Sequence, residues 1–307
     1  MVPSVDGDKF FYDNPLASSG NHHRSQWFGT ACCPPNISRL LASLGGYIYS
    51  EAPDAAFVHL YISGSAQLML GDRSVKLRQE SNYPWEGNIE ITVDLAPEPL
   101  EFPGAPEVCE QHTFELWLRI PGWCRKFTVA INGDVIDADT HSLGYICLHR
   151  TWRSGDRVNL SLNMPVERVY SHPNVKQNAG KVALQRGPVV YCLEEADHEI
   201  PLHRIVLPKD TTLTAQFDEE LLGGIVKIEG EALWRTELPS KNAEGAKGEN
   251  ADKASQSDQG RKGDKSARND LYTTERYPLE LVAITAIPYY AWDHRTPGEM
   301  TVWIEEA

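Results

Sequence analysis

Short segments that alternate apolar and polar residues run through most of this chain, and this period of two constrains the fold more than any other feature. Between residues 56 and 165 the segments are FVHLYISG, AQLMLGD, NIEITVDL, TFELWLRI, FTVAING, YICLHR and DRVNLSLNM. Each is bounded by Gly, Pro, Asn or Asp, which predicts short antiparallel strands packed as a β-sandwich. Asn132-Gly133 stands between two apolar runs and predicts a tight hairpin, because both turn positions need a positive φ angle.

A second set of apolar segments begins near Pro165. Its members are KVALQRG, PVVYCLE, HRIVLP, GGIVKIEGEAL, LELVAITAIPYY and MTVWIEE. We interpret residues 51–165 as a first β-sandwich, with 298–307 as a candidate segment to complete it, and residues 166–297 as a second β-sandwich. Residues 239–270 contain no Val, Ile, Leu, Met or aromatic residue. This stretch cannot bury enough apolar surface to offset its ordering entropy, so we predict a disordered polar insertion there.

One segment before the strands has a helical pattern. Ile37, Leu40, Leu41 and Leu44 fall at i, i+3, i+4 and i+7, which places them on one face of a helix. The two prolines at 34–35 suit the first turn, where backbone N–H groups have no intrahelical partner. The preceding 30 residues show little periodicity and predict a loop.

The overall charge limits the partners of the chain. It carries 29 Lys and Arg against 43 Asp and Glu, a formal net charge of −14. Such a chain repels phosphate backbones and anionic lipid, so we expect no nucleic-acid and no membrane partner. The N-terminal sequence has neither the basic region nor the apolar region of a signal peptide. The six cysteines are sparse for 307 residues. These features favour free thiols in a reducing cytoplasm.

Cys32 and Cys33 are adjacent and precede the predicted helix. Four interpretations are open for them. A vicinal disulfide would close a strained ring and is rare. Two small side chains could pack at the helix start, which adjacent cysteines alone suggest first. Two thiolates could supply half of a tetrahedral zinc site. A helix N-terminus or a metal could also lower the thiol pKa and prepare a nucleophile.

Long ordered stretches of the chain resemble one enzyme family. The stretch ACCPPNISRLLASLGGYIYS at 31–50 is similar to a signature of the β-L-arabinofuranosidases of glycoside hydrolase family 127, formerly a domain of unknown function. The other matching stretches are FFYDNPL, LWLRIPGWC, GKVALQRGPVVYCLEE and IPYYAWDHRTPGEMTVWI. The resemblance spans nearly the whole chain outside the polar insertion, and it is to the C-terminal part of the family's proteins.

The resemblance implies both a fold and a chemistry. It implies that residues 1–50 are the C-terminal remnant of a catalytic (α/α)6 barrel and that two β-sandwiches follow, so the fold class is mainly β. It implies a zinc ion bound by one Glu and three Cys, of which Cys32 and Cys33 are two. It also implies that Cys32 is the nucleophile of a retaining glycosidase, with a separate Glu as acid/base. The substrate class is an arabinofuranose-containing glycan.

The chain departs from the family pattern upstream of the cysteines. In the family the other metal ligands and the acid/base Glu lie there, whereas residues 1–31 contain no Glu and no Cys. We therefore expect a partial zinc site and little or no hydrolysis by this chain alone. The alternative is a non-catalytic β-sandwich module that binds glycan or docks onto a separately encoded barrel. A barrel half or a second copy of the chain are the expected protein partners.

Some polar and aromatic residues have two open interpretations. His22, His23, Arg24 and Trp27 precede the cysteine pair and either line a sugar pocket or belong to a surface loop. Glu194 and Glu195 resemble a carboxylate pair, but neighbours in a strand point to opposite faces, which argues against joint acid/base work.

Overall fold

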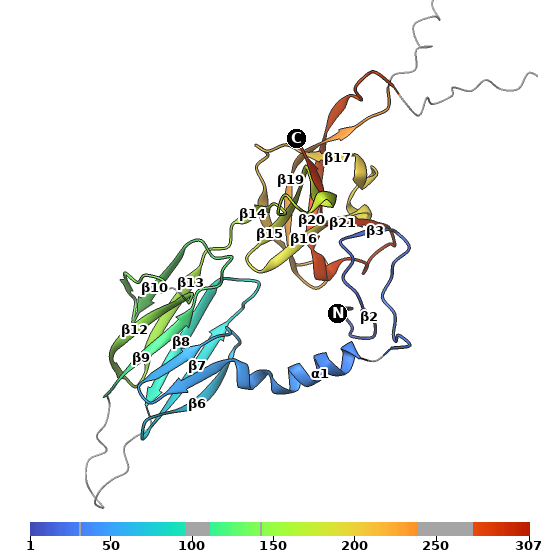
Figure 1. The fold of residues 1–307 in the computed structure, drawn as a ribbon. Helices are drawn as coiled ribbons and strands as arrows, with labels where there is room; N and C mark the ends of the chain where they lie inside the picture. The colour runs from blue at the N-terminus through green and yellow to red at the C-terminus, as the bar shows by residue number, and fades with distance from the viewer. Residues whose placement is uncertain (31, 96–110, 142, 239–272) are drawn as a thin grey trace, which may run out of the picture.

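The computed structural model describes residues 1–30, 32–95, 111–141, 143–238 and 273–307. It contains two β units, and an N-terminal segment runs from one to the other (Figure 1). The predicted polar insertion at 239–270 lies outside the described residues. Among the described residues, no helix combines the length and the hydropathy needed to cross a bilayer.

The first β unit is a sandwich of two sheets. One sheet has the order β11 (Asp134–Ile136), β10 (Phe127–Ile131), β13 (Asp156–Leu162), β8 (Asn88–Leu95), β7 (Arg73–Ser81) and β6 (Gly64–Leu70). The other has the order β12 (Tyr145–Arg153), β9 (Gln111–Arg119), β5 (Ala55–Val58) and β4 (Tyr49–Ala52). All neighbours are antiparallel except β5 and β9, which are parallel. The predicted turn is present, since Ile131 pairs with Asp134 and both Asn132 and Gly133 have positive φ.

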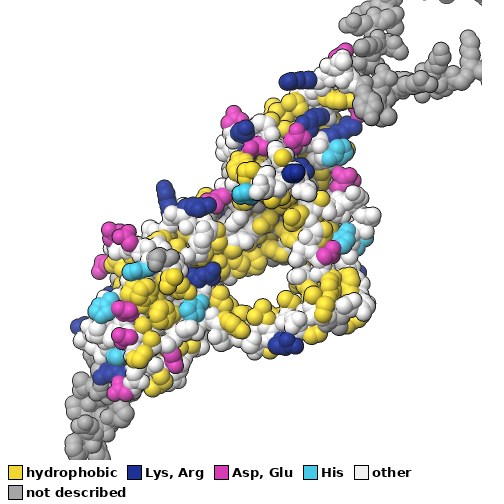
Figure 2. All heavy atoms as spheres, viewed as in Figure 1, with side chains coloured by type: hydrophobic (Ala, Val, Ile, Leu, Met, Phe, Trp, Pro, Cys, Tyr) yellow, Lys and Arg dark blue, Asp and Glu magenta, His cyan; other side chains and the backbone are white. Residues whose placement is uncertain are grey.

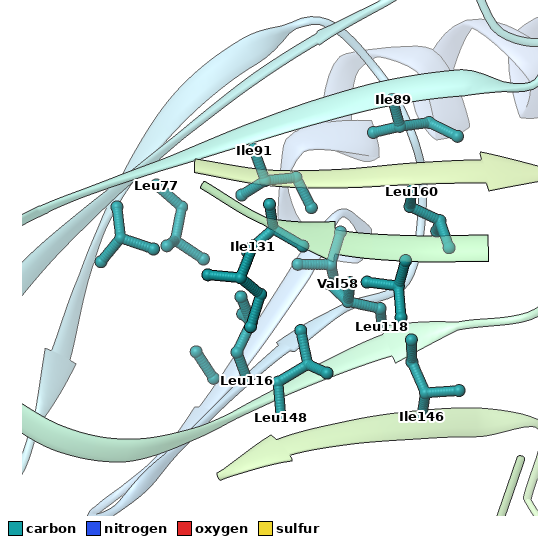
Figure 3. Close-up of a cluster of buried hydrophobic side chains, with 14 of the residues drawn as sticks. Val58, Leu77, Ile89, Ile91, Leu116, Leu118, Ile131, Ile146, Leu148 and Leu160 are labelled. Atoms are coloured by element: carbon teal, nitrogen blue, oxygen red, sulfur yellow. The ribbon is translucent and has the colours of Figure 1, made fainter. Parts of the chain in front are cut away.

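The core of this sandwich comes from the alternating residues that the sequence singled out. Leu77, Ile91, Leu116, Leu118 and Ile146 are fully buried and belong to one cluster. Figure 3 shows side chains of the two sheets pointing toward one another across this core. Burying such a side chain contributes about 1.5–3 kcal/mol relative to leaving it in water. The sandwich therefore covers its own apolar surface.

The second β unit forms one sheet that closes on itself, which differs from the expected sandwich of separate sheets. Its order is β14 (Val166–Val169), β15 (Lys181–Arg186), β22 (Ile304–Glu306), β17 (Ile205–Leu207), β19 (Ile225–Arg235), β20 (Leu279–Pro288), β16 (Val189–Glu194), β21 (Glu299–Thr301) and β3 (Ala17–Ser19). Strand β18 (Thr214–Asp218) pairs with β19, and a further pairing of β15 with β16 closes the ring. Short 3-10 helices cover Lys176–Asn178, Glu195–Asp197, Leu202–Arg204 and Tyr289–Ala291.

Strands β15, β16 and β17 of this second unit contain consecutive buried residues, which explains their nearly continuous apolar runs. Tyr191 and Leu193 enter one core cluster, whereas Cys192 between them enters another. The second of these clusters includes Phe11 and Trp292, so the N-terminal segment covers part of the sheet. The candidate assignment of 298–307 to the first sandwich is wrong. Strand β22 pairs with β15 and β17, because its Ile304 belongs to the core of the second unit.

A single helix bridges the two units. Helix α1 (Cys33–Ser43) is followed by the 3-10 helix η1 (Leu44–Tyr47), which leads into β4. None of the residues of α1 is buried, and Ile37, Leu40 and Leu41 are 40%, 47% and 63% exposed. On the face drawn in Figure 2, an opening separates α1 from the β units, and hydrophobic side chains lie along its edge. Among the described residues α1 is the one α-helix, so its origin in a barrel remains a prediction.

Candidate active site

Residues 1–30, which we call the N-terminal arm, are held on the second β unit. Strands β1 (Val2–Pro3) and β2 (Phe10–Phe11) form a small hairpin, and β3 pairs with β21. The Phe11 ring stacks on Trp292 with centroids 4.5 Å apart and an interplanar angle of 8°. The Tyr289 hydroxyl donates to the Pro15 carbonyl at 2.8 Å. Packing and strand pairing thus fix the arm, although its sequence has no periodicity.

Arg24 is the main polar anchor of the arm. Its side chain is buried, and its guanidinium donates to the carbonyls of Tyr290 (3.0 Å), Trp292 (2.5 Å) and Asp293 (3.2 Å). The Arg24 backbone N–H also donates to the Asp293 carboxylate at 3.2 Å. Burial lowers the pKa of Arg24 from its ordinary value, and the Asp293 and Glu194 charges oppose that shift. Arg24 therefore has a structural role here.

His22, His23 and Trp27 differ in how closely they are packed. His23 Nδ1 lies 2.7 Å from Asp293 Oδ1, and the His22 ring stacks on Phe11 at 5.2 Å. Trp27 is 60% exposed. The histidines thus lie against the arm and the second unit. The structure leaves Trp27 free to contact another molecule.

The two cysteines lie where the arm ends and α1 begins. Cys32 is the N-cap residue of α1, and Pro34 and Pro35 follow in its first turn, as expected. The two sulfur atoms are 3.7 Å apart, and both thiols are free, so the structure shows no vicinal disulfide. Cys32 is exposed and Cys33 is half-buried. Packing inside a core therefore does not account for Cys32.

Tyr12 is a member of this site that the sequence reasoning missed. Its hydroxyl lies 2.8 Å from Cys32 Sγ, and its ring packs against Phe28 at 5.4 Å. The only sequence signal was the aromatic run FFY, which predicts packing as readily as chemistry. The hydrogen bond with Tyr12, and next the contact with Cys33, lower the pKa of the Cys32 thiol. The same bond raises the pKa of the Tyr12 hydroxyl well above its ordinary value.

This arrangement favours a thiolate at Cys32. The N-terminus of α1 carries partial positive charge, and its first turn contains no acidic residue. The Asn36 side chain donates to the Cys32 carbonyl at 2.9 Å and fixes the backbone at that point. A thiolate is both a nucleophile and a metal ligand. Both chemistries are therefore open to Cys32.

The two cysteines fit half of a zinc site. A tetrahedral zinc ion with Zn–S bonds of about 2.3 Å requires sulfurs about 3.8 Å apart, close to the separation of Cys32 and Cys33. Within the part of the chain that the structure describes, no group of three or more His, Cys, Asp or Glu side chains is placed to hold a metal ion. A complete site would need further ligands.

Glu194 and Glu195 do not form a catalytic carboxylate pair. Glu194 is buried and accepts hydrogen bonds from Arg295 and from the Asp293 backbone, whereas Glu195 accepts one from the Glu299 backbone at 2.7 Å. The two carboxylates thus point to different partners. Glu194 ends β16 and Glu195 begins a 3-10 helix, so the expected alternation within one strand does not apply to this pair.

Comparisons with known proteins cover nearly the whole chain. Residues 3–46 match the model of the β-L-arabinofuranosidase GH127 catalytic domain, residues 55–164 the GH127 middle domain, and residues 166–305 the glycoside hydrolase family 127 C-terminal domain. A non-reducing end β-L-arabinofuranosidase of Bifidobacterium longum subsp. longum is 31% identical over 98% of this chain and 42% of its own length.

Solved structures agree with these matches. A GH127 β-L-arabinofuranosidase from Geobacillus stearothermophilus T6 superimposes with a TM-score of 0.80 at 42% identity, over 99% of this chain and 44% of its own. A second GH127 β-arabinofuranosidase gives a TM-score of 0.78 at 31% identity, over 99% of this chain and 43% of its own. The chain spans less than half the length of each relative. From the three consecutive domain matches and these likenesses, the chain belongs to glycoside hydrolase family 127.

Proposed function

We propose that this chain is the C-terminal part of a retaining glycoside hydrolase that acts on β-L-arabinofuranosides and that Cys32 is its nucleophile. The observation that carries the proposal is the position of Cys32 Sγ, exposed at the start of α1 and 2.8 Å from the Tyr12 hydroxyl. The matching family models and the names of the relatives support the substrate class.

The proposed reaction has two displacements. The Cys32 thiolate attacks the anomeric carbon, the glycosidic C–O bond breaks, and the leaving oxygen takes a proton from a general acid. Water then attacks the same carbon and gives a proton back to the group that acted as the general acid, while the C–S bond breaks and returns Cys32 to the thiolate, with overall retention. Tyr12 is placed to hold the thiolate through its hydroxyl. No Glu precedes Cys32 in this sequence, so the acid/base Glu of the family pattern has no counterpart in residues 1–31.

Zinc belongs to the same proposal. Cys32 and Cys33 would hold the ion together with two further ligands, and the bound ion would keep the Cys32 thiol deprotonated at neutral pH. Because the described residues place no third His, Cys, Asp or Glu ligand beside Cys32 and Cys33, we propose that the chain binds zinc weakly and hydrolyses little or no substrate alone.

The test uses an aryl β-L-arabinofuranoside with zinc and reductant. The chain is assayed alone and after mixing with the helical catalytic half of a family relative. We expect turnover and zinc uptake only in the mixture, loss of turnover in Cys32→Ala, and full turnover in the matched control Cys147→Ala. Turnover by the chain alone would contradict the proposed inactivity. Turnover that survives Cys32→Ala would contradict the nucleophile.

A second candidate function is a non-catalytic module that docks onto a helical partner. It is favoured by the apolar face of α1, where Ile37, Leu40 and Leu41 are 40%, 47% and 63% exposed. Co-elution with the catalytic half without restored activity would support this function. Retention on an arabinan column by the chain alone would instead support glycan binding.

A further inference from the structure

A pocket of about 380 Å³ lies where the two β units meet. One wall is the connection between β7 and β8, which includes Asn82, Trp85 and Glu86, and the other is formed by β16, β18, β19 and Tyr290. Figure 1 shows β7 and β8 of the first unit and β16 and β19 of the second unit on either side of the junction. Tyr12, Cys32 and Cys33 do not line this pocket. The size is in the range of small-molecule sites.

Aromatic rings from both units face this pocket. Trp85 and Phe217 are 43% and 63% exposed, although large apolar side chains gain free energy when they leave water. Tyr290 lies beside Trp85, with ring centroids 5.2 Å apart and an interplanar angle of 46°. Two exposed rings on opposite units that share one pocket indicate a surface that a ligand covers.

The walls of the pocket are held in place by specific contacts. Arg186 on β15 donates from Nη1 to the Trp85 carbonyl at 2.9 Å and so ties one unit to the other. The backbone N–H groups of Trp85 and Glu86 both donate to the Asn82 carbonyl, at 2.9 and 3.1 Å. Gly224 has φ +100°, and a Cβ there would come within 2.9 Å of the Phe217 ring. The backbone thus leaves room for that ring.

The polar lining is mixed in charge. The Asn82 amide, the Glu86 carboxylate and the Arg186 guanidinium supply donors and acceptors, and one charge of each sign is present. An anionic ligand would meet one cation in a chain of net charge −14. A neutral polyhydroxyl compound uses donors, acceptors and aromatic faces together, because its C–H groups stack on a ring while its hydroxyls form hydrogen bonds.

We propose that this pocket binds one sugar residue of a neutral glycan. Trp85 and Phe217 contact the faces of the sugar, and Asn82, Glu86 and Arg186 bond its hydroxyls. A site of this kind would hold the glycan on the enzyme through a contact that takes no part in bond cleavage. The proposal uses the family membership of the chain and does not depend on the chemistry proposed for Cys32.

The test is saturation-transfer difference NMR on the full 307-residue chain. The probes are L-arabinose, linear arabino-oligosaccharides and, as a second neutral glycan, maltotriose. We expect transfer to protons of at least one of these sugars. Truncating a ring that carries much of the contact, as in Phe217→Ala, should weaken binding roughly tenfold or more. The isosteric Glu86→Gln removes a charged acceptor without altering the shape of the wall and should also weaken binding.

Two control variants locate the sugar. Tyr47→Ala removes an exposed aromatic ring outside the pocket and should leave transfer unchanged, as should Cys32→Ser. An unchanged far-UV circular dichroism spectrum and an unchanged urea-unfolding midpoint show that each variant keeps its fold. The proposal is overturned if no sugar shows transfer, or if Phe217→Ala and Glu86→Gln both bind like the unmodified chain. Loss of transfer in Cys32→Ser would place the sugar at the thiol and would overturn it as well. The experiment measures sugar binding and not hydrolysis. A negative result would therefore reject this pocket as a sugar site without bearing on the proposed role of Cys32 as nucleophile.

Discussion

The first β-sandwich buries its apolar side chains against one another, whereas helix α1 leaves its apolar side chains in contact with solvent. Leu116 on β9 is fully buried, and Leu41 on α1 is 63% exposed. Both residues lie in a pattern with the correct period for their element. The difference therefore lies in the partners available and not in the amphipathic pattern. A regular pattern predicts which face needs cover, and only the fold shows whether cover is present.

The comparison extends to the N-terminal arm. The arm has no pattern at all, yet Phe11 and Arg24 are both buried against the second β unit. Helix α1 directly follows the arm and has a strong pattern but no buried residue. Cys32 stands at the boundary between the anchored arm and the uncovered helix. The contact that positions the Cys32 sulfur therefore comes from the arm, through the Tyr12 hydroxyl.

The largest effect should come from the same substitution made in both regions. Leu116→Ala removes core contacts and should lower the free energy of unfolding by about 2–5 kcal/mol. Leu41→Ala removes a side chain that is mostly exposed and should change the free energy of unfolding by less than about 0.5 kcal/mol. Urea unfolding of the two variants measures the difference. Comparable losses would mean that the α1 face is covered in solution.

Much of the fold followed from the period-two pattern. Most strands of the first sandwich and the turn at Asn132-Gly133 could be predicted, because a buried strand face and a tight turn each depend on residues that are close together in the sequence. Strand β7 was missed because its last inward position is Gln79, a buried polar residue whose side chain donates to the Tyr49 hydroxyl at 2.7 Å. A polar residue at a core position hides the alternation.

Pairings between distant segments could not be predicted. Ser18 on β3 pairs with Met300 on β21, but these two strands have three residues each and carry almost no pattern of their own. The cysteines could be singled out because adjacent thiols before a helix are chemically unusual. Tyr12 could not, because its role depends on an arm whose path is fixed by Arg24 and by carbonyls more than 260 residues away.

An intermediate effect is expected when the arm loses its anchor. Arg24→Met leaves buried carbonyls at Tyr290, Trp292 and Asp293 without their donor, which should cost about 2–3 kcal/mol. The loss should be local, so the arm amides exchange hydrogen faster while those of β9 do not change. The matched control is Arg39→Met on α1, whose guanidinium bonds only the Asn36 side chain among the interactions described. If Arg24→Met leaves exchange in the arm unchanged, stacking of Phe11 on Trp292 is the dominant anchor.

The smallest effect concerns the thiol at the boundary. The Tyr12 hydroxyl lowers the pKa of Cys32, so Tyr12→Phe should raise that pKa toward the ordinary value for a thiol. The thiolate fraction at a fixed pH near neutrality would then fall, and the pH profile of alkylation would shift to higher pH. We expect alkylation of Cys32 by iodoacetamide to slow a few-fold, roughly in proportion to the lost thiolate. The rate is followed at each cysteine by peptide mass spectrometry, with a chelator present to exclude metal.

Cys192 provides the internal reference for this experiment, since burial raises the pKa of its thiol well above the ordinary value and the side chain is inaccessible. Cys32 should react first and Cys192 last in the unmodified chain. A Tyr12→Phe variant that alkylates Cys32 at the original rate would show that the arm does not hold Tyr12 against the sulfur in solution. In that case the anchored arm and the exposed helix would be independent of each other, and the contact between Tyr12 and Cys32 would not be maintained by the described part of the chain alone.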